Sequence, residues 1–240
     1  MMINVQQPAV QLCRLITLLA CCLLLSGCIA GGQSSFQITD LAKSDIDNVT
    51  DMHINEVRNL TLELMVKLYK RNPRELAKAV PGTTINDRIR QLFNKPRADG
   101  FSELRGLDGT AAIPLAFDPQ FGGDRVFALM AGISGMLHAS YNNQYEFFIL
   151  DELDQQKLYN SARNLEAIAW RLNNRRDAGG GLFILSNGTT PNGIRNLSYE
   201  RQFGKMIALQ DMMALLIADG TNRTITKIVH SAASMTLLPI

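Results

Sequence analysis

An apolar run near the start of the chain, residues 15–25, places the strongest constraint on what the sequence can fold into. The run is eleven residues long, Thr17 is its only polar residue, and Arg14 is the only charged residue before it. A helix that crosses a bilayer needs about 20 apolar residues, so this run is too short to span one. Its length is typical of the apolar core of a secretory signal peptide. We therefore expect the run to be removed and the folded body to lie downstream of it.

The residues that end the run carry a recognisable processing signal. Leu25, Ser26, Gly27 and Cys28 follow one another, and this string resembles the lipobox of bacterial lipoproteins. The resemblance implies that Cys28 receives a diacylglycerol thioether, that the peptide is cut before it, and that the new amino terminus is acylated. Small side chains before Cys28 would let a membrane peptidase reach the backbone, and the thiol is the nucleophile that is alkylated.

A second string of the same kind, Leu18-Leu19-Ala20-Cys21, competes for this role. Processing there would leave only residues 15–20 as the apolar core, which falls below the usual range of about 7–15 residues. We therefore assign the anchor to Cys28. Cleavage before Cys28 also removes Cys13, Cys21 and Cys22. The mature body then holds no further cysteine for a disulfide, a Cys-ligated metal or a cysteine nucleophile.

The residue after the anchor predicts where the protein is sorted. In Gram-negative lipoproteins an Asp at this position resembles the signal for retention in the inner membrane, and here the residue is Ile29. The resemblance therefore implies an outer-membrane location facing the periplasm. Stable anchoring needs roughly two membrane-binding groups, and three or more acyl chains on Cys28 would exceed that number. The membrane is thus the first predicted partner, and other envelope proteins are candidates for the second.

The apolar pattern of the body predicts a mainly α-helical fold. We divide the chain into a removed leader (1–27), an acylated cysteine with a flexible tether (28–38) and one globular domain (39–240). A helix over 39–71 is indicated by the three- and four-residue spacing of six apolar side chains, Ile46, Val49, Val57, Leu60, Leu64 and Leu68. Further helices are expected at 73–80, 85–93, 124–141, 154–175, 198–218 and from Thr224 onward, with N-caps at Asn72, Thr84, Asp154 and Ser198.

A small β-hairpin completes the expected fold. Residues 182–186 and 194–197 flank the turn-rich segment 187–193, which contains Pro191 and two glycines. The alternative is an α/β fold in which 144–150, 182–186 and 224–230 form a three-stranded sheet.

The apolar stretch within the predicted helix 124–141 is too short to span a membrane. We expect this helix to be buried at the centre of the fold, where its small residues would let another helix approach closely.

The catalytic and metal-binding patterns that we searched for are incomplete in this sequence. His53, His138 and His230 fall in separate elements without metal-ligand spacing. Ser134 lies in a string close to a nucleophile elbow, but it falls in the middle of a predicted helix. The acidic cluster at Asp151, Glu152 and Asp154 is typical of a helix start. We therefore predict no catalytic residue, metal ligand or cofactor, and an enzyme is the less favoured class.

Two features suggest contact surfaces. The irregular segment 97–123 carries apolar side chains that could anchor a partner, Phe101, Leu104, Leu107, Phe117 and Phe121. The alternative interpretation is that these side chains cover the core beneath a long loop. The methionines of helix 198–218, Met206, Met212 and Met213, form a stripe that is usually core and in a minority of proteins lines an adaptable groove.

These observations favour a lipid-anchored envelope lipoprotein with a non-catalytic docking or structural role. The alternative is a membrane-tethered hydrolase acting on cell-wall material, and a carrier of an apolar ligand is a weaker hypothesis. The 24 basic and 22 acidic side chains give a net charge of only +2, which argues against a nucleic-acid partner.

Overall fold

The architecture is that of a helical bundle with one small hairpin. The computed structural model describes residues 45–93, 100–144, 153–228 and 236–240, and Ala42–Ile240 form one compact unit. Over the described residues the fold is mainly α, with a single two-stranded antiparallel sheet, so the predicted fold class is confirmed. The α/β alternative is wrong, because 182–186 and 224–228 form no strands; residues 145–150 of its other strand lie outside the described residues.

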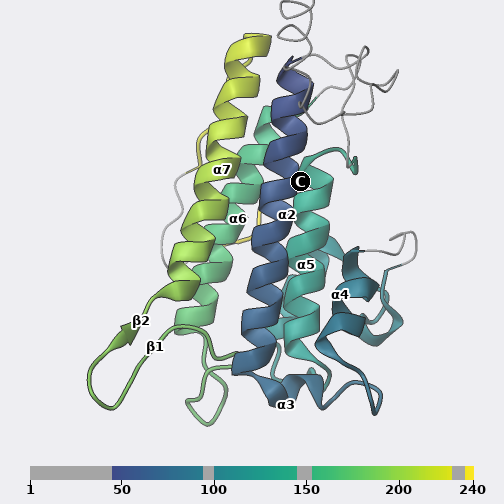
Figure 1. Ribbon diagram of the computed structural model, residues 1–240, viewed down its shortest axis with the longest axis vertical. Helices are drawn as coiled ribbons and strands as arrows, with labels where there is room; N and C mark the ends of the chain where they lie inside the picture. Colours follow the sequence, from purple (N-terminus) through teal and green to yellow (C-terminus); the bar gives the residue numbers. More distant parts are fainter. Residues whose placement is uncertain (1–44, 94–99, 145–152, 229–235) are drawn as a thin grey trace, which may run out of the picture. The chain divides into compact units, whose positions relative to one another are not determined.

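Four long helices run side by side and form the bundle (Figure 1). They are α2 (Asp45–Arg71), α5 (Arg125–Ser140), α6 (Gln155–Asn174) and α7 (Ser198–Thr221). The short helices α3 (Pro73–Leu76) and α4 (Ile85–Phe93) follow α2. Helix α6 packs most extensively on α7, and α2 contacts both α5 and α7. No helix among the described residues is long and apolar enough to cross a membrane.

Helix α5 is the buried centre of the bundle, as its sequence predicts. Thirteen of its sixteen residues are buried, because other elements cover it on all sides. Its neighbours contribute fully buried side chains to the same core, among them Leu64, Met65 and Leu68 of α2, Leu165 and Ile168 of α6, and Met206 of α7. Of the six α2 residues with the predicted helical spacing, Val57, Leu60, Leu64 and Leu68 are buried, whereas Val49 is 44% exposed.

The segment after α4 is more ordered than the sequence suggests. Within it lie three short 3-10 helices, η2 (Ser102–Leu104), η3 (Gly109–Ala111) and η4 (Ile113–Phe117). Both η3 and η4 pack on α5. At Gly132 of α5 an added Cβ would lie 2.3 Å from Cγ1 of Ile113 and 3.2 Å from the Gly109 carbonyl oxygen. Gly132 of α5 therefore admits this segment, and the helices that approach closely there are the short 3-10 helices η3 and η4.

The hairpin is shorter than predicted. Strands β1 (Gly188–Thr189) and β2 (Arg195–Asn196) pair antiparallel, with Gly188 opposite Asn196. Residues 182–186 form no strand because a side chain satisfies their backbone instead. The Asn72 amide donates to the Leu185 carbonyl oxygen over 2.8 Å and accepts from the Leu185 amide over 2.7 Å. Asn72 thus holds this segment, and its side chain does not cap α3 as predicted.

The chain after α7 is extended where a helix from Thr224 was predicted. Helix α7 ends at Thr221 and is followed by Asn222, whose φ of 53° is left-handed. Residues 223–228 carry no helix, and residues 229–235 lie outside the described residues. Side chains of α6 satisfy the backbone of this tail. Gln156 exchanges two hydrogen bonds with the Thr226 backbone, and Asn164 accepts from the Leu238 amide over 2.6 Å and donates to its carbonyl oxygen over 2.9 Å.

Several helix starts use the caps that the sequence indicates. Asp154 accepts from the amides of Gln156 and Lys157 at the start of α6. Thr84 and Asp87 exchange hydrogen bonds at the start of α4, as in a capping box. At α7, however, Ser198 is the first helical residue, and the Asn196 side chain accepts from its amide over 3.1 Å. Helix α3 ends at Leu76, and after it the amides of Lys78 and Ala79 form turns by donating to the carbonyl oxygens of Glu75 and Leu76, the third residue before each.

Candidate functional site

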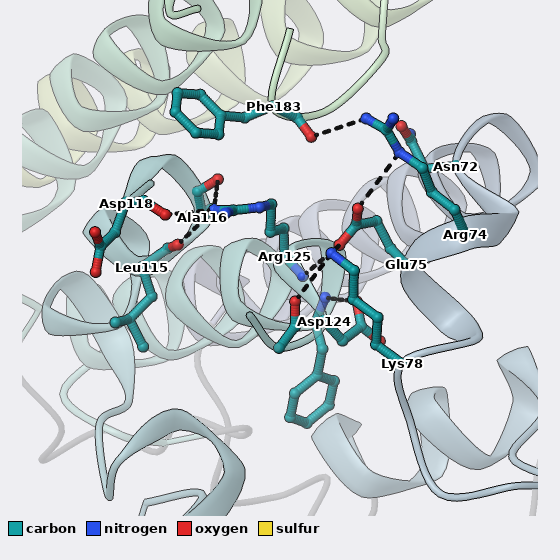
Figure 2. Close-up of polar contacts among 12 residues, drawn as sticks. Asn72, Arg74, Glu75, Lys78, Leu115, Ala116, Asp118, Asp124, Arg125 and Phe183 are labelled. Atoms are coloured by element: carbon teal, nitrogen blue, oxygen red, sulfur yellow. Dashed lines mark hydrogen bonds and ion pairs between the residues drawn. The ribbon is translucent and has the colours of Figure 1, made fainter. Parts of the chain in front are cut away.

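A large polar cleft lies beside α3. Its volume is about 480 Å³, and it opens between α3, the start of α5 and the loop before the hairpin. Figure 2 shows its charged side chains and their contacts. Four charged residues dominate its lining, Arg74, Glu75, Lys78 and Arg125, and Asp177, Phe183 and several small or apolar residues complete it.

Glu75 forms the floor of this cleft. Its side chain is only 2% exposed, and its carboxylate accepts from the Lys78 ammonium over 2.7 Å and from the Arg125 backbone amide over 2.9 Å. The Arg74 guanidinium lies 3.6 Å from the second carboxylate oxygen. Because Arg125 is the first residue of α5, Glu75 places a negative charge at the positive end of that helix dipole. The proline at Pro73 starts α3 and thereby fixes the position of Glu75.

Arg125 forms a wall of the cleft and is held by backbone oxygens. Its guanidinium donates to the Asp118 carbonyl oxygen over 2.7 Å and to that of Leu115 over 3.3 Å. The guanidinium also lies 4.9 Å from the centre of the Phe183 ring, which is a cation–π distance. Figure 2 shows Arg125 reaching from α5 towards the segment of Leu115, Ala116 and Asp118. This side chain therefore ties η4 and the 182–186 segment to α5.

A second group of charges lies beneath the cleft. The carboxylate of Asp124 caps α5 by accepting from the Phe127 amide and also accepts from the Tyr69 hydroxyl over 2.8 Å. Arg88 of α4 lies 3.3 Å from Asp124 and donates to both carboxylate oxygens of Glu103 over 2.7 and 2.8 Å. Its guanidinium also stacks 4.1 Å from the Phe127 ring centre. These contacts connect α2, α4, η2 and α5 through one network.

Burial determines the proton affinity of this network. Loss of solvation raises the pKa of Asp124 to about 6, although the Phe127 amide, the Tyr69 hydroxyl and Arg88 all favour its ionised form. Burial and the adjacent Asp124 carboxylate raise the pKa of the Tyr69 hydroxyl well above its ordinary range. For Glu103, burial acts to raise the pKa, and the hydrogen bonds from Arg88 and Gln91 outweigh it, so the pKa is lowered.

The geometry suits a structural role for these charges better than catalysis. Glu75 and Asp124 are covered, and their oxygens already accept hydrogen bonds from the protein. The rim offers two cations, Arg74 and Lys78, and one carboxylate, Asp177, which accepts from the amides of its own loop. Among the described residues no three His, Cys, Asp or Glu side chains lie close enough together to hold a metal ion.

A separate polar cluster lies in the half of the bundle nearer the start of α2. His53 Nε2 and the Tyr141 hydroxyl are 2.9 Å apart, and Gln210 donates to the same hydroxyl over 2.9 Å. All three side chains are buried. Loss of solvation lowers the pKa of His53 to about 4 and raises that of Tyr141 above its ordinary range. The cluster therefore holds a neutral imidazole at neutral pH.

An apolar cavity adjoins this cluster, lined by Tyr141, Ile54, Val57, Leu137 and Phe93 among others. Its volume is about 40 Å³, enough for a few water molecules at about 10–15 Å³ each. An acyl chain needs far more space, so the cavity as it stands gives the apolar-carrier hypothesis no support.

The apolar residues predicted to bind a partner all contact the core. Leu104 and Phe121 are 1% and 5% exposed, and Phe101, Leu107 and Phe117 are partly buried against the same cluster. The Phe101 ring stacks edge-on against Phe127 with centroids 5.1 Å apart. Leu104 and Phe121 are thus not accessible to a partner in this conformation. A partner-binding role for the segment stays a prediction, and only its half-buried members can carry it.

The other residues singled out by sequence fall in different places. Ser134 is buried in the middle of α5, His53 is buried, and His138 is partly exposed. Cys28 and the lipobox, His230, Asp151 and Glu152 lie outside the described residues. Sequence reasoning missed Arg88. A signal existed in the sequence: Arg88 shares one face of α4 with Ile85 and Leu92, and a cation within an apolar stripe indicates a buried partner.

Comparison with known proteins gives no relative. No protein-family profile matches the chain, and no curated protein and no solved structure is significantly similar to it.

Proposed function

We propose that this chain is a lipid-anchored lipoprotein of the bacterial cell envelope whose helical body has a non-catalytic docking or structural role. The observation that carries the proposal is the string Leu25-Ser26-Gly27-Cys28 after an apolar run of signal-peptide length. Ile29 after the anchor favours the outer membrane, with the body facing the periplasm.

The length of chain between the anchor and the bundle agrees with this role. Residues 29–44 separate Cys28 from Asp45, where α2 begins. Even when fully extended, a segment of sixteen residues reaches about 55 Å. The bundle is therefore expected to work close to the membrane surface.

The charged cleft supports a non-catalytic role for the body. A general acid or base must reach the substrate within hydrogen-bonding distance, and Glu75 is covered and already bound by Lys78 and by the Arg125 amide. Its contacts hold α3 against α5. The hydrolase alternative thus receives no support from this cleft.

The anchor is tested by substituting the cysteine that is proposed to carry it. We expect Cys28→Ala to lose incorporation of labelled palmitate and to keep its leader. The matched control is Cys21→Ala, which removes the competing cysteine and should be labelled and processed like the unmodified protein. Palmitate incorporation into Cys28→Ala, or its loss in Cys21→Ala alone, would contradict the assignment.

Sorting is tested by one substitution after the anchor. Ile29→Asp should move the lipidated protein from the outer to the inner membrane fraction of a Gram-negative host, and Ile29→Leu is the matched control. Identical fractionation of both variants would remove the argument for the outer membrane. The docking role is tested by crosslinking the lipidated protein in intact cells and identifying what co-purifies with it.

A further inference from the structure

The exposed apolar side chains of the bundle are unevenly distributed. Ten large apolar residues are exposed among the described residues, and five of them lie on two adjacent helices, α2 and α7. These five are Val49 and Met52 of α2 and Met212, Leu215 and Leu216 of α7, and we refer to them as the α2–α7 patch. Met52 is 73% exposed and Leu215 is 61% exposed.

The antiparallel register of the two helices brings these residues together. Lys67 of α2 donates to the Ser198 carbonyl oxygen, and Thr61 donates to the sulfur of Met206. Each step along α2 towards its start is thus matched by an equal step along α7 towards its end. The same register places Val49 level with Leu216 and Met52 level with Met212. Figure 1 shows the start of α2 and the end of α7 at the same end of the bundle.

The patch is not needed by the core. Seven residues of α7 are buried, and Met206 and Met213 are two of them. The face turned towards the outer edge of α2 carries Met212 and Leu216, which are 47% and 43% exposed. Of the three methionines in the predicted stripe, Met206 and Met213 are thus buried and Met212 is exposed. A cluster of exposed apolar side chains of this kind marks an interaction surface.

The position of the patch indicates its occupant. Val49 lies four residues after Asp45, the start of α2, and sixteen residues, 29–44, separate Asp45 from Cys28. Because a segment of sixteen residues reaches about 55 Å even when fully extended, a lipid anchor at Cys28 keeps the start of α2, and with it the patch, near the bilayer. We propose that the α2–α7 patch docks on the lipid bilayer and inserts its side chains at the headgroup boundary. This inference rests on the proposed anchoring of Cys28.

The charges around the patch indicate what kind of lipid surface it fits. Exposed side chains of both signs lie on the same two helices, Glu56 on α2 and Lys205 and Asp219 on α7. Electrostatic attraction to anionic lipids is therefore small, and apolar insertion supplies the binding. Binding to zwitterionic phosphatidylcholine vesicles should persist at high salt, because salt screens only the electrostatic part.

The experiment uses the lipidated full-length protein, in which acylation leaves no free thiol after the leader is removed. A cysteine introduced by Met212→Cys is then the only site for a thiol-reactive fluorophore. After reconstitution into phosphatidylcholine vesicles, the fluorescence is measured with and without brominated acyl chains, which quench only probes at the bilayer. The control is Ile194→Cys, which is 67% exposed in the hairpin loop, away from the start of α2. We expect strong quenching at position 212 and none at position 194.

A further substitution tests the apolar mechanism in the same labelled protein. Adding Leu216→Asp to Met212→Cys should reduce the bilayer-inserted fraction by roughly tenfold or more, since it replaces apolar burial with a charge. Leu216 is exposed, so the variant is expected to fold, and its circular dichroism and melting temperature check this.

The outcomes separate this inference from the anchoring proposal. If the unsubstituted protein takes up the fluorophore at Cys28, the anchor proposal has failed. If Cys28 is blocked and positions 212 and 194 are equally unquenched, the anchor stands and the docking inference is wrong. If brominated lipid has no effect at position 212 and unlabelled Met212→Cys forms disulfide-linked dimers, a second copy covers the patch, which also overturns the inference.

Discussion

The two ends of helix α2 are stabilised in opposite ways. Near Arg71, Tyr69 bonds to a buried carboxylate, Asp124, which in turn lies beside the buried cation Arg88. Near Asp45, His53 takes part in a neutral trio with Tyr141 and Gln210. The first end therefore keeps charges away from water, and the second buries only uncharged polar groups.

The difference shows what each kind of group requires of the fold. A buried charge loses much solvation energy and must be paired, and accordingly Asp124, Glu75 and Arg88 each contact several partners from different elements. Unpartnered buried atoms occur at both ends: His53 Nδ1 and Gln210 Oε1 at the neutral end, and Arg88 Nε at the charged end, have no hydrogen-bond partner among the described residues. The charged end thus ties the elements together through ion pairs, whereas the neutral end does so through the shared Tyr141 hydroxyl.

The largest expected effect comes from breaking the charged end. Arg88→Met keeps much of the side-chain volume but leaves Asp124 without its cation, and we expect a loss of about 3–5 kcal/mol in the free energy of unfolding. The measurement is urea denaturation at neutral pH. Arg90→Met on the same helix is the control, because Arg90 is 67% exposed and forms an ion pair with the exposed Asp87. Equal effects of the two substitutions would contradict the assignment of a buried network.

A pH titration compares the two ends directly. The pKa of His53 falls from 6.5 to about 4 in the fold, so its contribution is complete above pH 6.5 and is lost as the pH falls towards 4, in total about 3 kcal/mol. The pKa of Asp124 rises from 3.8 to about 6, so its contribution is present below 3.8 and is lost as the pH rises towards 6. The two ends therefore oppose each other over the same pH range.

Two variants separate these contributions. His53→Gln should flatten the loss of stability between pH 6.5 and 4, whereas Asp124→Asn should steepen it, because the offsetting carboxyl is gone. The measurement is the slope of the unfolding free energy against pH, which is independent of the absolute destabilisation of either variant. Parallel slopes in both variants and the unmodified protein would show that neither group titrates as proposed.

The neutral trio should be moderately sensitive to loss of its shared hydroxyl. Tyr141→Phe leaves His53 Nε2 and the Gln210 amide without their common partner, and we expect a loss of about 1–3 kcal/mol. Tyr159→Phe serves as the control, since its hydroxyl contacts the exposed backbone of Ile228. Thermal unfolding of the two variants measures the difference, and a larger effect at Tyr159 would count against a buried trio.

The smallest expected effect lies at the exposed surface of the neutral end. Leu215→Ser and Leu216→Ser should each change the free energy of unfolding by less than about 0.5 kcal/mol, because these side chains project from the core. Met213→Ser on the next turn is the matched contrast and should cost about 2–5 kcal/mol, since Met213 is fully buried. A large loss at Leu215 or Leu216 would mean that the body itself, and not a docking surface, requires them.

The sequence predicts the long elements well because periodicity and local capping determine them. Helix α4 begins and ends where the pattern of Ile85–Phe93 predicts, and Asp154 caps α6 through its own side chain. Helix ends and caps depend on residues within one or two turns of each other. They can therefore be predicted from the sequence before the tertiary structure is known.

The contacts that organise the charged end could not be predicted in this way. Asn72 was expected to cap α3, yet its amide binds Leu185, 113 residues further along the chain. The residues after α7 keep a helical apolar spacing, but their backbone is satisfied by side chains of α6 and no helix forms at 223–228. In each case a partner that is distant in sequence overrides a local preference, and no spacing within the segment reveals that partner.

The way in which the tail is held on α6 has a consequence for how the sequence can vary. Asn164 recognises the amide and carbonyl of Leu238, and Asn160 recognises the carbonyl oxygen of Pro239. Both asparagines contact main-chain atoms, which every residue except proline supplies in full. Substitutions at position 238 therefore keep these bonds, whereas replacing either asparagine removes them whatever the tail contains. We expect substitutions at position 238 of the tail to be tolerated, and substitutions of Asn160 and Asn164 in α6 to be harmful.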